Sequence, residues 1–296
     1  MKRRTRGGEL TRRESLARDA WRDLLRNPLF VIAAICVAAL IAMAAWPGLF
    51  AGWFGNGDPR ACDLANSSRG PAAGHPFGFD TQGCDLYANV IYGARASVLV
   101  GVLASLICFL IAVVSGLLAG YGGRILDVGV SRLADVFLGF PFILGAIIIL
   151  TTIEDRSILL IALVLASFAW PTWTRLMRAS VVQVNHSDYV NAARTLGSPH
   201  LWIVFRHIVP NSITPLVVYA ALGVGGFIAA ESALTYLGVG LEYPAISWGL
   251  QLASAETRFS VAPHLLLFPG AALSITVISF VVIGDLLRDA FDPRAR

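Results

Sequence analysis

The feature that most constrains this chain is a series of long apolar windows. A helix that crosses a hydrocarbon core of ~30 Å needs about twenty predominantly apolar residues. Such windows lie near residues 29–50, 97–120, 131–153, 157–177, 212–237 and 264–286. The composition agrees, because 56% of the 296 residues are hydrophobic and 14% are charged, against about 45–50% and about 25% in soluble proteins. The sequence therefore predicts an all-α integral membrane protein with six transmembrane helices.

The distribution of basic residues predicts how these helices are oriented. Residues 1–27 carry more Lys and Arg than Asp and Glu, which places this tail in the cytoplasm by the positive-inside rule. Six crossings return the C-terminus to the same side, and the segment 51–94, with nearly balanced charge, then lies outside. The formal net charge of +4 therefore reflects topology and attraction to lipid. No basic stripe interleaved with aromatic residues indicates nucleic-acid binding.

The start of the chain has two interpretations. Ala42-Met43-Ala44 resembles the cleavage site of a signal peptide, but the charged lead is long and the apolar run continues past it. These features favour a retained first helix. Within the tail, apolar residues recur near helical spacing at Leu16, Ala20, Leu24 and Leu25. We expect an amphipathic helix there, lying at the cytoplasmic headgroups.

Four cysteines are present, and none forms a CxxC motif. Cys36 and Cys108 fall inside predicted spans, where packing is their simplest role. Cys62 and Cys84 share the outer segment, where an oxidising compartment permits a disulfide. Two free thiols are the alternative, because spacing alone does not define connectivity.

Two residues within the predicted spans are candidates for the translocation path. Pro141 removes a backbone hydrogen bond and should kink the third helix, either as a packing feature or as a gate. Glu231 lies toward the outer end of the fifth helix, where it must face protein or water. It either lines a solute path or makes a structural hydrogen bond to a neighbouring helix. Between the fifth and sixth spans, the apolar segment 240–270 predicts a short helix or re-entrant segment at the outer face.

The sequence contains no motif for catalysis. Lys2 is the one lysine in the chain, so a Walker A loop cannot form and this chain does not hydrolyse ATP by itself. HExxH and GxSxG motifs are absent, and the five histidines are too scattered to predict a metal site. We therefore expect a non-enzymatic subunit that binds no cofactor of its own.

The segment 188–211 interrupts the membrane pattern with two short helical stretches. Ser187 is placed to cap the first, and Gly197 is placed to end it in a left-handed conformation. Ser198-Pro199 resembles a cap followed by proline at the first helical position, and Pro210 is expected to close the second stretch. Two short cytoplasmic helices at a sharp angle predict a docking surface. An interfacial helix resting on lipid is the alternative.

The same segment carries a family likeness. The run Asn191-Ala192-Ala193, then Gly197 after three residues, then His207-Ile208-Val209-Pro210 after nine more, resembles the EAA loop of ABC-importer permeases, E-A-A-x3-G-x9-I-x-L-P. Asn191 stands where that pattern has Glu, and His207 where it has Ile. The stretches HPFGFDTQGCDLYANVIYGARASVLVG, LAGYGGRILDVGVSRLADVFLGFP, ESALTYLGVGLEYPAISWG and FPGAALSITVISFVVIGDLLRDAFDPR are similar to the second permease subunit of dipeptide, oligopeptide and nickel transporters. The dipeptide permeases are the most similar group.

The resemblance implies a type I ABC-importer permease fold with cytoplasmic coupling helices. The chain would then divide into the tail 1–27, a first transmembrane helix with its extracytoplasmic loop at 28–94, and a five-helix permease core at 95–296 that contains the coupling loop 186–211. Coupling to an ATPase is implied for Asp188, Asn191, Ala192, Ala193, Gly197, Arg206 and Pro210.

The resemblance also implies partners. These are a homologous permease subunit, two ATP-binding subunits or one fused ATPase that hold ATP and Mg²⁺, an extracytoplasmic binding protein and membrane lipid, all at a bacterial plasma membrane. Peptides are the leading substrate class, with nickel complexes and haem as alternatives. A proton-coupled secondary transporter would be expected to show paired acids near the midplane or inverted repeats with broken helices, and neither is evident. A purely structural subunit is the remaining rival.

Overall fold

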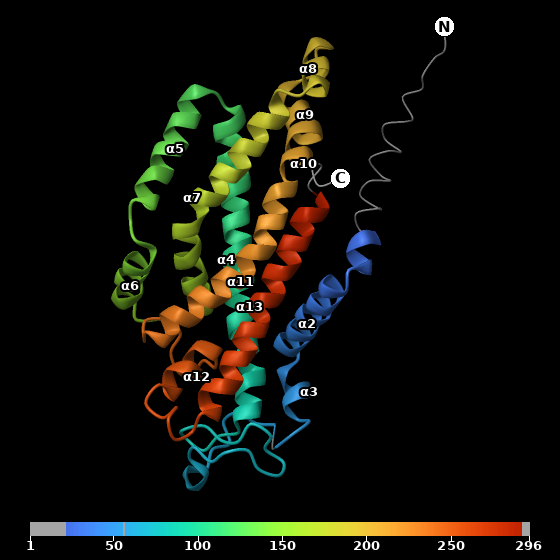
Figure 1. Ribbon diagram of the computed structural model, residues 1–296. Coiled ribbons are helices and arrows are strands. Elements are labelled where there is room, and N and C mark those ends of the chain that lie inside the picture. Colours follow the sequence, from blue (N-terminus) through green and yellow to red (C-terminus); the bar gives the residue numbers. More distant parts are fainter. Residues whose placement is uncertain (1–21, 56, 292–296) are drawn as a thin grey trace.

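The computed structural model of the chain describes residues 22–55 and 57–291, and it is helical throughout its membrane region (Figure 1). Most of the predicted amphipathic tail, residues 1–27, lies outside the described residues. The helical elements in chain order are α2 (Pro28–Ala45), α3 (Pro47–Ala51), η1 (Leu64–Asn66), α4 (Leu86–Tyr121), α5 (Arg124–Leu138), α6 (Phe142–Thr152), α7 (Ile158–Asn185), α8 (Asp188–Thr195), α9 (His200–Ile203), η2 (Val204–Ile208), α10 (Val209–Ser212), α11 (Thr214–Tyr236), α12 (Trp248–Ala255) and α13 (His264–Phe291).

The predicted membrane fold is confirmed. Among the described residues, five helices are long and apolar enough to cross a bilayer, and α5 with α6 makes a sixth span if the bent pair is counted as one. α2 ends earlier than predicted, at Ala45, because the backbone leaves the helical region at Trp46 before Pro47 starts α3. α4 begins eleven residues before its window, at Leu86 rather than at 97, because the Asp85 carboxylate accepts a hydrogen bond from the Tyr87 backbone N–H and caps the helix. The proposed boundary between residues 94 and 95 therefore falls inside a helix.

The third span bends at the predicted position, but the bend is a break between two helices and not a kink within one. α5 and α6 meet at an angle of 81° across residues 139–141. Gly139 ends α5, and Pro141 precedes α6 with an extended backbone. Proline disfavours the helical conformation at the residue before it, so the sequence Gly-Phe-Pro stops one helix and starts another.

The centre of the bundle is the contact between α4 and α7, where small residues let the two backbones approach closely. Ala104 and Ala112 are fully buried on α4. A Cβ atom added at Gly116 would lie 2.6 Å from the Met177 Cβ, and one at Gly120 would lie 2.7 Å from Val181 Cγ1. Small residues at such crossings are how membrane helices gain packing contacts without a hydrophobic driving force.

The two ends of the bundle differ in construction. α8 and α9 stand at one end, toward which the last turns of α13 also point, whereas α3, the segment 52–85 and α12 gather at the other (Figure 1). Trp248 of α12 donates a hydrogen bond from its indole Nε1 to the Val90 carbonyl of α4 at 2.9 Å. The predicted short helix between the last two spans is thus present as α12. Cys62 and Cys84 of the outer segment are joined by a disulfide.

Candidate functional site

α8 is a short helix with a well-defined end. Gly197 has a φ of 77°, in the left-handed region. The Ser198 N–H donates to the Ala193 carbonyl at 3.1 Å, and the Gly197 N–H donates to the Arg194 carbonyl at 2.9 Å. These two bonds form a complete Schellman motif, so the predicted role of Gly197 is observed. Ser187 occupies the N-cap position, but its hydroxyl donates to the Val184 carbonyl at 2.6 Å and does not cap the helix.

Arg194 connects α8 to the end of α7 by hydrogen bonds. The Arg194 guanidinium donates to the side-chain oxygen of Asn185 and, at 3.3 Å each, to the Asn185 carbonyl and to the Asn191 side-chain oxygen. Asn191, which stands where the family pattern has Glu, is therefore an acceptor for Arg194. Asp188 lies in the first turn of α8, where a negative charge interacts favourably with the helix dipole.

The second helical stretch differs from the prediction in two respects. Pro199 itself is the N-cap residue of α9, so Ser198 is not the cap. Pro210 does not close the stretch, because α10 continues to Ser212. The chain passes through a π-helical turn, Val204–Ile208, in which the Val209 N–H reaches back to the Val204 carbonyl. The wider turn just before Pro210 accommodates the proline, which has no N–H to donate.

The exposed face of α8 carries polar residues, the aromatic ring of Tyr189 and one small residue. Asp188, Asn191 and Ala192 are exposed, whereas Val190 is fully buried. Ala193 is only 9% exposed because it packs against the chain's own core. Of the two alanines predicted to permit close approach, Ala192 is thus the one that a partner can reach.

Beside α8 lies an apolar groove of about 490 Å³, lined by Leu201, Trp202, Phe205 and Arg206. Leu201 is 72% exposed and Phe205 is 69% exposed. The loop is anchored to a second span as well, because the Tyr121 hydroxyl at the end of α4 hydrogen-bonds His200 Nδ1 at 2.9 Å. The segment 188–212 is thus a firmly attached projection with one polar face and one apolar face.

Glu231 lies inside the subunit. It is fully buried, and its carboxylate accepts hydrogen bonds from the hydroxyls of Ser97 at 3.1 Å, Thr235 at 2.9 Å and Ser232 at 3.3 Å. Ser97 belongs to α4, so this cluster joins α4 to α11 in the half of the bundle that carries α12. The geometry favours the structural alternative over a residue that lines a solute path.

Two ion pairs between α5 and α7 were not predicted from the sequence. Arg178 donates to both carboxylate oxygens of Asp127, at 2.5 Å and 2.6 Å, and Arg175 donates to Asp135 at 2.6 Å. Opposite charges inside or just beside two predicted spans were the available signal. Among the described residues, no three His, Cys, Asp or Glu side chains gather in a way that would hold a metal ion.

These features define a class of protein: a multi-span membrane protein with an anchored projection at one end and a disulfide-closed segment at the other. Residues 111–296 match the family model described as a binding-protein-dependent transport system inner membrane component, and residues 15–71 match the N-terminal transmembrane domain of oligopeptide transport permease C. The chain belongs to this family of ABC-importer permeases, in the group that includes the second, C-type subunit.

Curated relatives match this chain over nearly its whole length. The chain is 35% identical to the dipeptide transport system permease protein DppC of Alkalihalophilus pseudofirmus, over 94% of this chain and 90% of that protein. It is 33% identical to the oligopeptide permease OppC of Bacillus subtilis, over 95% and 91%. It is also 33% identical to the glutathione permease GsiD of Pectobacterium atrosepticum, over 94% and 91%.

Solved structures support the fold. A chain of the MetNI methionine ABC transporter in inward-facing conformations superposes with a TM-score of 0.56 at 17% identity, covering 69% of this chain and 97% of that one. A chain of an amino acid ABC transporter crystallised with histidines gives a TM-score of 0.52 at 15% identity, covering 67% and 92%. The predicted ABC-permease fold is confirmed at this level.

Proposed function

We propose that this chain is one of two membrane subunits that form the translocation path of an ATP-driven peptide importer, and that α8 docks in a cleft of a cytoplasmic ATPase subunit. The observation that carries the proposal is the exposed face of Asp188, Asn191 and Ala192 on a helix fixed to α7. A short helix that is anchored at both ends moves as a rigid body, so it can transmit a displacement without bending. Lipid contact is better suited to the neighbouring groove of Leu201 and Phe205.

The same contacts suggest how ATPase closure reaches the membrane. Movement of α8 would pull on α7 through Arg194 and on α4 through His200 and Tyr121. α5 would follow α7, because the Asp127–Arg178 and Asp135–Arg175 pairs join the two helices. The break at Pro141 separates α5 from α6, so the cytoplasmic half of this span can rotate while α6 stays in place. Such rigid-body rotation is a recognised way to alternate access to a central site.

Peptides are the proposed substrate class. The relatives named above are permeases for dipeptides, oligopeptides and glutathione, all of which contain peptide bonds. An extracytoplasmic binding protein would deliver the peptide to the end that carries the Cys62–Cys84 segment. Both termini would lie in the cytoplasm, as the positive-inside rule indicates. ATP and Mg²⁺ would be held by the ATPase subunits.

The test is reconstitution of this chain in liposomes with a sister permease, an ATPase and a binding protein from the same organism. We expect ATP hydrolysis and uptake to depend on a peptide loaded on the binding protein. Mass spectrometry of the ligand that co-purifies with the binding protein separates peptides from nickel complexes and haem. Uptake driven by a proton gradient without ATP would support a secondary transporter instead, and peptide-independent hydrolysis without transport would support a structural subunit.

A further inference from the structure

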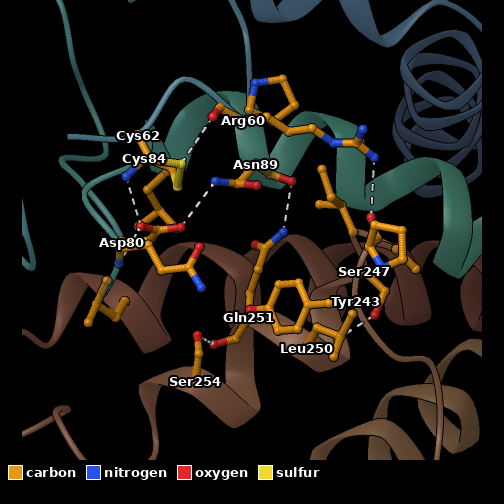
Figure 2. Close-up of a pocket in the computed structure, with 17 residues that line it drawn as sticks. Arg60, Cys62, Asp80, Cys84, Asn89, Tyr243, Ser247, Leu250, Gln251 and Ser254 are labelled. Carbon is orange, nitrogen blue, oxygen red and sulfur yellow. Dashed lines mark hydrogen bonds between the residues drawn. A yellow bond between two sulfur atoms is a disulfide. The ribbon is translucent and has the colours of Figure 1, made fainter. Parts of the chain in front are cut away.

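A cavity of about 270 Å³ opens at the outer end of the bundle, between the disulfide-closed segment, the start of α4 and α12 (Figure 2). Its walls include Arg60, Asp80, Asn89 and Gln251. None of these residues belongs to the α8 surface, which lies at the opposite end of the molecule (Figure 1). The cavity is near the lower end of the ~300–1,000 Å³ range of small-molecule sites, so it fits a ligand of one or two amino-acid residues.

One wall of the cavity holds an immobilised carboxylate. Asp80 Oδ1 accepts hydrogen bonds from the backbone N–H groups of Gln82 and Cys84, both at 2.8 Å. The other oxygen, Oδ2, accepts a long hydrogen bond of 3.3 Å from the Asn89 side chain. A carboxylate has about four lone-pair positions, so Oδ2 can accept another donor. Burial raises the pKa of Asp80 above its ordinary value despite these bonds, which means that its negative charge is incompletely stabilised.

A second acceptor lies within the wall of the cavity, behind its surface, and lacks a donor. Gln251 Nε2 donates to the Asn89 carbonyl at 2.7 Å, and the buried Gln251 Oε1 has no hydrogen-bond partner within the described residues. Flipping the amide would put Oε1 against the Asn89 carbonyl, so the hydrogen bond to that carbonyl determines the orientation. A buried acceptor without a donor costs about 1–3 kcal/mol, and such groups in native structures call for an explanation.

The positive charge of the cavity lies away from these acceptors. The Arg60 guanidinium donates to the Pro244 carbonyl at 3.3 Å, and Figure 2 shows it on the opposite side of Asn89 from Asp80. A ligand that fills the cavity thus meets acceptors at one side and a cation at the other. A zwitterion with an ammonium group and a carboxylate separated by one or two residues has the matching arrangement of charges.

We propose that this cavity binds the ammonium group of a short peptide through Asp80 Oδ2, with the carboxyl end of the peptide toward Arg60. The inference rests on the proposed function, because it takes a peptide to be the transported solute. The cavity would hold a peptide released by the binding protein before it enters the path. An inserted lysine of the binding protein has the same ammonium chemistry, but it would bring no carboxylate for Arg60.

The test measures binding of dialanine by isothermal titration calorimetry to the purified complex of this chain and its sister permease in nanodiscs, without binding protein or ATPase. We expect saturable binding that is lost with N-acetyl-dialanine, which has no ammonium group, and that is weakened with dialanine amide. Asp80→Asn should weaken dialanine binding at least tenfold. Glu256→Gln, which removes an equal charge from an exposed residue outside the cavity, should not.

Folding of Asp80→Asn is checked by formation of the Cys62–Cys84 bond, and the comparison of the three ligands on the unmodified protein needs no variant. Equal binding of dialanine and N-acetyl-dialanine would overturn the proposal, and so would no binding of either. Absent dialanine binding, together with weaker capture of the binding protein by Asp80→Asn, would assign the cavity to a partner side chain and also overturn it. ATPase retention and ATP-driven uptake test the proposed function separately, because neither partner is present in this assay.

Discussion

Glu231 of α11 is a fully buried acid that accepts a hydrogen bond from Ser97 of α4. An acid in a predicted span indicates either a solute path or a structural bond, and the choice depends on neighbours that sequence does not reveal. The structure surrounds it with the hydroxyls of Ser97, Ser232 and Thr235. Replacing it by leucine would leave buried hydroxyls without their acceptor, at a cost of about 1–3 kcal/mol each.

We therefore predict that Glu231→Leu lowers the thermal unfolding temperature of the purified protein strongly, whereas Glu231→Gln lowers it much less, because glutamine keeps an acceptor oxygen. Uptake per folded complex should be similar to wild type for Glu231→Gln. An unchanged unfolding temperature with altered peptide selectivity in Glu231→Gln would instead indicate that this residue lines the solute path.

Cys62 and Cys84 give a second prediction at the residue scale. The disulfide closes a loop with a sequence separation of 22 residues, and closing a loop of this size removes unfolded-state entropy worth about 3 kcal/mol on the chain-entropy model. Intact-mass analysis should find these two thiols blocked to alkylation until reductant is added. Cys62→Ser should make the outer segment more sensitive to protease without preventing membrane insertion. Alkylation of both thiols in the unreduced protein would contradict the pairing.

At the scale of elements, apolar windows predicted the spans because a bilayer demands continuous hydrophobic length, but they did not predict how the spans end or bend. Pro141 in the Gly-Phe-Pro sequence at 139–141 predicts a kink, and packing around it decides between a kink and an 81° break. Periodicity cannot separate a π turn from an α turn over five residues, so Val204–Ile208 was also missed. Nor could it decide between the adjacent Ala192 and Ala193.

The ion pairs between α5 and α7 can be tested by reversing and exchanging their charges. Asp127 and Arg178 meet in a two-bond geometry at a partly exposed site, where a charged hydrogen-bonded pair is worth about 1 kcal/mol. We predict that Arg178→Asp uncouples ATP hydrolysis from uptake because the two negative charges repel α5 from α7. The exchange variant Asp127→Arg with Arg178→Asp should recover part of the coupling. Failure of the exchange to recover any coupling, with both proteins folded, would contradict this role.

At the scale of the whole molecule, we expect the α8 end and the disulfide end to face opposite sides of the membrane. Single cysteines at Ser67, Ser198 and Thr257 in a cysteine-free background test this arrangement. A membrane-impermeant maleimide applied to intact cells should label Ser67→Cys and Thr257→Cys. Ser198→Cys should be labelled only after the membrane is permeabilised. Labelling of Ser198→Cys from outside would invert the proposed orientation.

The central claim is that α8 transmits motion from an ATPase, and Ala192→Trp tests it most directly. Ala192 is exposed on α8, so a large side chain there disturbs a partner without entering the chain's own core, as it would at Ala193. Ala73→Trp, on the exposed outer segment, is the matched control for added bulk.

The measurement is the amount of ATPase that co-purifies with each variant, together with uptake by the reconstituted complex. We predict that Ala192→Trp inserts and pairs with its sister subunit but loses the ATPase subunits or at least tenfold of its uptake, while Ala73→Trp keeps both. A helix that only rests on lipid would accept tryptophan readily, because this residue is favoured at membrane interfaces. Wild-type ATPase retention and uptake in Ala192→Trp would contradict the account.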